Sequence, residues 1–238
     1  MKKLITFVLS TLVCLGAFGQ NIQLHYDFGH NIYKNDLSSR ARFTTTVENF
    51  KADNLGSTYF FVDMDYLSDT DLGIQSAYWE ISREFNFWQN SWLAAHVEYN
   101  GGLSNSAGTY NDAWLLGLAY NGHSEDYSKT WSIQAMYKVI PDHCTKAIEH
   151  SFQITGVWNI NFAKNWLTFS GYIDFWKEYY SWQNTHYLML TEPQFWINFN
   201  QINGMKANIS LGTEIKVYHN FVGKGTYCIP TIALKYTL

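Results

Sequence analysis

Strict alternation of apolar and polar side chains runs through the last eight residues of the chain. One set is apolar: Ile232, Leu234, Tyr236 and Leu238. The other is mostly polar: Thr231, Ala233, Lys235 and Thr237. Successive side chains of a strand point to opposite sides, so this period predicts a two-faced β-strand. The same alternation recurs about a dozen times, in segments of about ten residues, the length that a tilted strand needs to cross a bilayer.

A secretory leader precedes these segments. Two lysines at its start are followed by an apolar run over residues 4–15, and Ala17 and Gly19 are the small residues expected before a cleavage site. We therefore expect residues 1–19 to be a cleaved signal peptide and residues 20–238 to form one domain. The alternative is an uncleaved membrane anchor, for which the apolar run is short.

A leader followed by repeated two-faced strands predicts an all-β fold, a transmembrane antiparallel β-barrel of 12 strands in the outer membrane of a Gram-negative bacterium. Lipid tolerates no unpaired strand edge, so we expect the barrel to be closed. The aromatic content of 18% suits girdles at the membrane interfaces. Four tryptophans at predicted strand ends are expected to be interface anchors: Trp92, Trp131, Trp158 and Trp166.

Two predicted strands depart from the simple pattern. Residues 113–120 are apolar on both sides, so the alternation does not tell which side faces lipid. The segment over residues 187–199 contains Pro193, which predicts a bulge or an irregularity because proline donates no ladder hydrogen bond. The second strand is expected to begin at about Arg40.

Charge and cysteine content exclude several functions. Without the two leader lysines, 14 Lys and Arg stand against 20 Asp and Glu, so the mature charge is −6 and no basic patch predicts a nucleic-acid partner. Cys144 and Cys228 have no metal-type spacing, and both a disulfide and two free thiols remain open. We expect no metal and no cofactor, because no zinc or calcium ligand run is present.

Four segments together resemble the nucleoside-specific outer-membrane channel (Tsx) family. They read STYFFVD over residues 57–63, EISREF over 80–85, TFSGYIDF over 168–175 and EPQF over 192–195. The resemblance implies a monomeric twelve-stranded barrel and a nucleoside as solute. Leu238 departs from the aromatic residue that usually ends such barrels, a position that concerns recognition by the barrel-assembly machinery.

The alternation places polar and aromatic side chains on one inner wall, which is our candidate solute-binding set. Its members are Tyr59, Phe61, Asp63, Asp65, Tyr78, Glu80, Glu84, Glu98, Tyr172, Asp174 and Trp176. Aromatic faces beside hydrogen-bonding groups can stack a planar ring and bind a sugar. The alternative is structural, because small barrels fill their interiors with side chains that satisfy one another.

These patterns favour a passive channel for small polar solutes, with nucleosides as the candidate cargo. The expected partners are outer-membrane lipid, the solute and the barrel-assembly machinery, and the expected state is a monomer. The first alternative is a closed barrel with a structural or interaction role. The second is an outer-membrane enzyme, which we do not expect, because the scattered histidines lack a nucleophile at a recognisable spacing.

Overall fold

The computed structural model describes residues 19–66, 73–105, 108–109, 112–141, 147–180, 183–202, 205 and 207–238. Nearly all of the predicted signal peptide lies outside these residues, and so does Cys144. Cys228 is a free, exposed thiol. None of the helices in the described part of the chain is long and apolar enough to cross a membrane.

The described chain is built almost entirely from strands. They are β1 (Gln20–Asp27), β2 (Phe43–Asp53), β3 (Gly56–Tyr66), β4 (Ile74–Asn86), β5 (Leu93–Ser104), β6 (Gly108–Thr109), β7 (Ala113–His123), β8 (Lys129–Ile140), β9 (Glu149–Phe162), β10 (Leu167–Tyr180), β11 (Thr185–Thr191), β12 (Gln194–Asn198), β13 (Ile209–His219) and β14 (Thr226–Thr237). Two short helices, α2 (Gly29–Ile32) and η1 (Phe199–Gln201), complete them.

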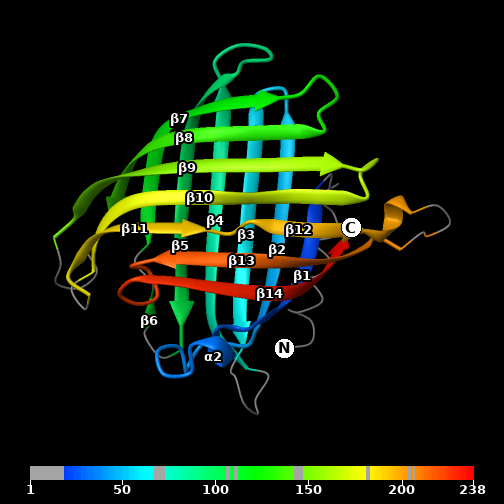
Figure 1. Cartoon of the computed structure of the whole chain (residues 1–238). Coiled ribbons are helices and arrows are strands. Elements are labelled where there is room, and N and C mark those ends of the chain that lie inside the picture. The colour runs from blue at the N-terminus through cyan, green and yellow to red at the C-terminus, as the bar shows by residue number, and fades with distance from the viewer. Residues whose placement is uncertain are drawn as a thin grey trace, which may run out of the picture.

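These strands make a closed twelve-stranded barrel. Strands β11 and β12 both pair with β10 and β13, so they are two parts of one barrel strand, and β6 is a two-residue extension beside β5. The first strand pairs with the last, with Ile22 opposite Tyr236, and β9 pairs with β10. In Figure 1, β1–β5 form the rear wall and β7–β14 cross in front of them. The predicted closed antiparallel barrel is confirmed.

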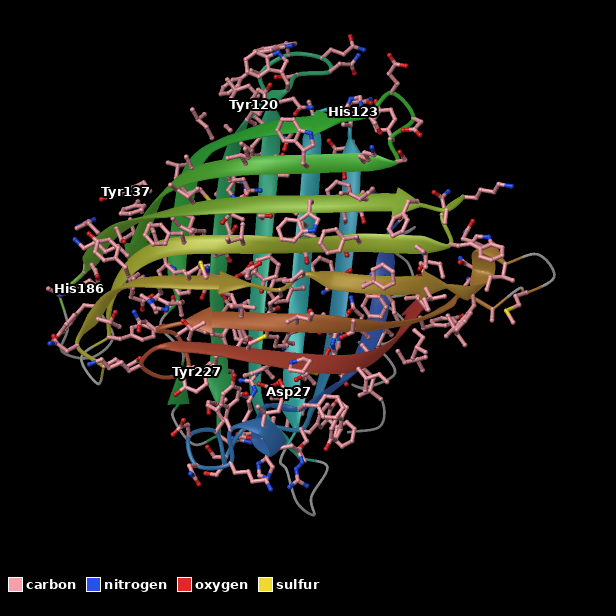
Figure 2. The ribbon with its side chains drawn as sticks, in the orientation of Figure 1. Asp27, Tyr120, His123, Tyr137, His186 and Tyr227 are labelled. Carbon is pink, nitrogen blue, oxygen red and sulfur yellow. The ribbon has the colours of Figure 1, made fainter. Side chains whose placement is uncertain are left out.

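The barrel is apolar outside and polar inside. In β1, Leu24 is 48% exposed, whereas its neighbour His25 is 2% exposed. On β7 the question that the sequence left open is settled, since Trp114, Leu116 and Leu118 are exposed on the outside. Figure 2 labels Tyr120, a fourth outward residue of β7, at the periphery of the barrel. An exposed apolar belt of this extent is what a bilayer covers, and it is rare on monomeric soluble proteins.

The two ends of the barrel differ. The start of β1 and the end of β14 lie at one end, with Asn21 opposite Thr237, together with the short connections such as residues 124–128 and 163–166 (Figure 1). The connection over residues 28–42 lies at the other end and carries α2. Strand β2 begins at Phe43, later than the sequence predicted, because this connection folds onto the barrel instead of extending the strand. Its Leu37 packs with Tyr218.

The irregularity predicted at Pro193 separates β11 from β12. The Pro193 carbonyl still accepts a hydrogen bond from the Ile215 amide (2.9 Å), and the Glu192 amide donates to the Tyr172 carbonyl (3.1 Å). Across the break, Gly171 has φ = 151°. A Cβ at this position would lie 2.7 Å from the Glu192 carbonyl oxygen, so the break requires glycine there.

Candidate functional site

Two aspartates on the inner side of β3 are held by hydroxyl groups. Thr46 donates a hydrogen bond to Asp63. Asp65 accepts hydrogen bonds from Thr44 (2.6 Å) and Ser76 (3.1 Å), which lie on the flanking strands. Within the described chain, neither aspartate forms an ion pair. Both side chains are half-buried, so they remain partly accessible to solvent inside the barrel.

Aromatic rings adjoin these carboxylates. The Phe61 ring centroid lies 6.0 Å from those of both Tyr59 and Tyr78, which makes a row of three rings on the inner side of β3 and β4. Tyr78 donates a hydrogen bond to Glu80 (2.7 Å), and Tyr59 donates to Glu48 (3.3 Å). The row therefore offers ring surface with acceptor oxygens beside it.

A buried network fills the interior beside β4 and β5. Glu84 accepts hydrogen bonds from Asn121 (2.6 Å) and from Gln134 on β8 (3.4 Å). Because β8 is not a neighbour of β4 in the sheet, the second contact must run through the inside of the barrel. His96 contacts Glu98 through its Nε2 atom at 3.1 Å. All of these groups except Asn121 are buried, as expected for groups that stabilise the wall.

The inward-facing lysines of the front wall, which is formed by β7–β14, already have partners. Lys216 forms an ion pair with Glu214 at 3.3 Å. Lys138 lies 5.1 Å from the centroid of the Trp176 ring and 4.0 Å from Glu178. The carboxylates of Glu214 and Glu178 offset the charge of these two lysines, and the Trp176 ring adds a cation–π contact to Lys138.

A second aromatic group, Trp196, stands on β12 and is fully buried. Its indole N–H donates to Gln194 (3.0 Å), and Lys235 lies 4.0 Å from the centroid of its ring. His25 contacts the same indole edge-on, at 6.2 Å between centroids. Side chains from β1 and β14 therefore both contact the Trp196 ring of β12 inside the barrel.

The structure places the whole predicted candidate set on the inner wall but divides it in two. Half-buried members are Tyr59, Phe61, Asp63, Asp65, Tyr78, Glu80 and Tyr172, and buried members are Glu84, Glu98, Asp174 and Trp176. Whether either group binds a solute stays a prediction. The sequence reasoning did not include four further inner residues: Glu48, Glu178, Glu192 and Trp196.

The alternation itself would have found most of these omissions. Glu48 continues the inner series of Thr44 and Thr46, and Glu178 lies two residues beyond Trp176. Glu192 was harder, because inward-facing Leu188 in the same strand is apolar and fully buried. Among the described residues, no group of three or more His, Cys, Asp or Glu side chains could hold a metal ion.

Fold and inner wall define a transmembrane-type β-barrel with a polar, acidic interior. The chain belongs to the family described as Domain of unknown function (DUF5020), whose model matches residues 19–238. No curated protein matches it.

Two solved porin structures share the fold. The NanC porin superposes with a TM-score of 0.57 and 9% identity, over 92% of this chain and 100% of that one. The KdgM porin superposes with a TM-score of 0.51 and 10% identity, over 92% of this chain and 98% of that one. At such identities the likeness extends to the barrel fold alone.

Proposed function

We propose that this protein is an outer-membrane channel through which small polar solutes diffuse passively. One observation carries the proposal: inward-facing side chains such as Asp63 and Glu80 keep solvent-accessible surface although they lie inside a closed barrel. The interior along β3 and β4 therefore has room for water. Weak contacts at several points along such a wall let a solute enter and leave.

The outward face and the closure of the barrel support this location and a monomeric state. The exposed apolar side chains provide the lipid contact, and the pairing of β14 with β1 completes the barrel within one chain. We propose that the barrel-assembly machinery inserts the chain as a monomer. Its terminal strand keeps alternating apolar residues up to Leu238, which is 56% exposed.

The narrower part of the proposal names nucleosides as solutes. The row formed by Tyr59, Phe61 and Tyr78 offers ring faces for a base, and the adjacent carboxylates can accept hydrogen bonds from ribose hydroxyls. Stacking of a base on an aromatic side chain contributes about 1–3 kcal/mol in other proteins. The porin folds of NanC and KdgM support a channel and carry no information on this solute.

Planar-bilayer conductance of the refolded mature chain tests both parts. We expect discrete single-channel steps, reduced when a nucleoside such as adenosine is added. Steps that adenosine does not change would support the channel function and exclude nucleosides as its solutes. A correctly folded barrel without steps would favour the closed barrel with a structural role.

A further inference from the structure

We propose that the lumen selects by charge: cationic and neutral solutes pass, whereas anions of the same size are rejected. This inference rests on the proposed channel function and names the class of solute for it. Nucleosides would then be accepted and nucleoside monophosphates refused. Three features of the lumen support this selectivity: the carboxylates of the rear wall, the lysines of the front wall and one buried histidine.

Carboxylates of the rear wall lack cationic partners. Asp63, Asp65 and Glu80 are held by hydroxyl groups, and Glu48 by an amide of Asn21 (2.6 Å) and a phenol. In the described ranges no Lys, Arg or His forms an ion pair with any of these four. Hydrogen bonds from neutral donors satisfy the oxygens and place no positive charge beside them.

Cations of the front wall, in contrast, are occupied. Lys216 is paired with Glu214, Lys138 lies between Trp176 and Glu178, and a third lysine stands over Trp196. An anion entering the barrel would have to displace these contacts before it gained a cation. In the described structure, the lumen therefore presents four carboxylates without an ion-pair partner, whereas only one of the three front-wall lysines, Lys235, has a neutral ring in place of a carboxylate.

His96 also belongs to the groups that are already partnered. It is 1% exposed, and its Nε2 atom lies 3.1 Å from Glu98 and its Nδ1 atom 3.6 Å from Glu84. Both neighbours are carboxylates, so a protonated ring would face an acceptor at each nitrogen. His96 therefore offers no free cation to an anion in the lumen.

Selectivity follows from the physics of a narrow charged passage. Low-dielectric walls that carry one sign of charge concentrate counter-ions about 10-fold or more, and rings of Asp or Glu make cation channels in this way. We therefore expect K⁺ to permeate about tenfold better than Cl⁻ at low ionic strength. Near 1 M salt, where the screening length falls to about 3 Å, the preference should shrink.

Zero-current potentials in a KCl gradient measure the permeability ratio. The refolded mature chain is compared with Asp63→Asn and Glu80→Gln in the same KCl gradient. Each neutral variant should lower the ratio while single-channel steps persist. Glu125→Gln, which makes the same charge change on an exposed connection between β7 and β8, is the matched control and should leave the ratio unchanged.

Liposome swelling extends the test to solutes. Lysine, glutamine and glutamate are similar in size and differ in charge. Adenosine and its monophosphate are a second pair, which differs in charge and also in size by one phosphate group. We expect entry to fall in the order lysine, glutamine, glutamate. A K⁺/Cl⁻ permeability ratio at or below one would overturn the charge selectivity alone. The same conclusion would follow if Glu125→Gln changed this ratio as much as Asp63→Asn and Glu80→Gln do. Absence of conductance from a folded barrel would instead overturn the channel.

Discussion

At the scale of single residues, the side chains of this barrel face one of two environments, an apolar exterior or a polar interior. Leu24 is exposed on the outside, where lipid replaces water, and needs no polar partner. His25 faces inward and contacts both Gln23 (2.9 Å) and Thr231 (3.2 Å). A buried polar group without partners would cost roughly 1–3 kcal/mol, which explains why inward-facing side chains such as His25 hydrogen-bond with one another.

The outward face can be tested with a charge. Leu211 is 40% exposed on β13, and Leu211→Arg places a guanidinium in lipid. We expect a loss of about 2–4 kcal/mol in the free energy of unfolding if the site lies near the bilayer midplane. Urea titration of the barrel in lipid vesicles measures it.

A matched control is Leu55→Arg, in the tight β2–β3 turn, where Leu55 is 67% exposed. Near the interface the same change should cost no more than about 1 kcal/mol. Equal losses at the two sites would contradict the assignment of Leu211 to the lipid-facing side.

Asp126 provides a pH-dependent residue outside the membrane-spanning strands. Hydrogen bonds from the hydroxyls of Ser124 (2.6 Å) and Ser128 (2.8 Å) and from the Ser128 amide (3.1 Å) lower the pKa of its carboxyl group from 3.8 to about 2. Because the folded pKa is depressed, its contribution to the turn is fully present above about pH 4. It is lost as the pH falls through 2.

An NMR titration of the Ser128 amide checks this prediction. Its chemical shift should titrate with a midpoint near pH 2, and Asp126→Asn should remove that transition because the amide side chain does not ionise. A midpoint at the ordinary aspartate value would show that the turn does not hold the carboxylate.

At the scale of elements, one strand of the barrel is made from two. Pro193 interrupts the ladder between β11 and β12, and Gly171 on β10 accommodates the break with a backbone conformation that side chains rarely adopt. Trp158 covers this glycine, with a ring atom 2.9 Å from the position of a Cβ. The ladder is therefore interrupted at this point, while β11 and β12 both stay paired with β10 and β13 and the barrel stays closed.

Gly171→Ala tests how strictly the break requires glycine. The new Cβ would lie 2.7 Å from the Glu192 carbonyl oxygen at positive φ, so we expect at least about 1 kcal/mol of destabilisation. Gly156→Ala, in adjacent β9, meets only the Ile173 side chain at 3.2 Å and should stay within about 0.5 kcal/mol of the parent. Thermal or urea unfolding of the two variants, measured side by side, decides between them, and a larger loss for Gly156→Ala would refute the explanation.

At the scale of the whole molecule, the end opposite the termini is partly covered by the chain itself. Leu37 packs with Tyr218 and Ile229, and Arg40 binds Asp27 through two guanidinium nitrogens (2.8 and 3.0 Å). Asp27 lies close to α2, as Figure 2 shows. In the proposed channel, a solute that enters at this end would pass residues 28–42.

Loosening the cover should change permeation without opening the barrel. Leu37 is 7% exposed, and Leu37→Ala should remove about 2 kcal/mol of local packing and raise the mean single-channel conductance. Ile32→Ala is the control, since Ile32 in the same connection is 51% exposed and should leave conductance unchanged. Bilayer recordings that show the two variants alike would argue against a cover that limits flow.

Fold class, strand number and face could be predicted from the sequence, because a strand has a period of two and a barrel has only two sides. In strands such as β3 and β13, the apolar series that contains Val62 or Leu211 identifies the outer side, and the neighbouring strands are not needed for this prediction. The break at Pro193 was likewise readable, since a missing N–H is a local property.

The remaining features depend on contacts between segments that are distant in the chain. On the apolar strand β7, Leu115 identifies the inner side, because it packs against Met136 inside the barrel. The fold over residues 28–42 and the contact between Glu84 and Gln134 join segments far apart in the chain. Partnerships across a lumen depend on strand order, tilt and register, which no local period encodes. The alternation therefore fixes which side chains face inward on the strands that carry it, whereas strand order, tilt and register in the closed barrel decide which carboxylates have no ion-pair partner among the described residues.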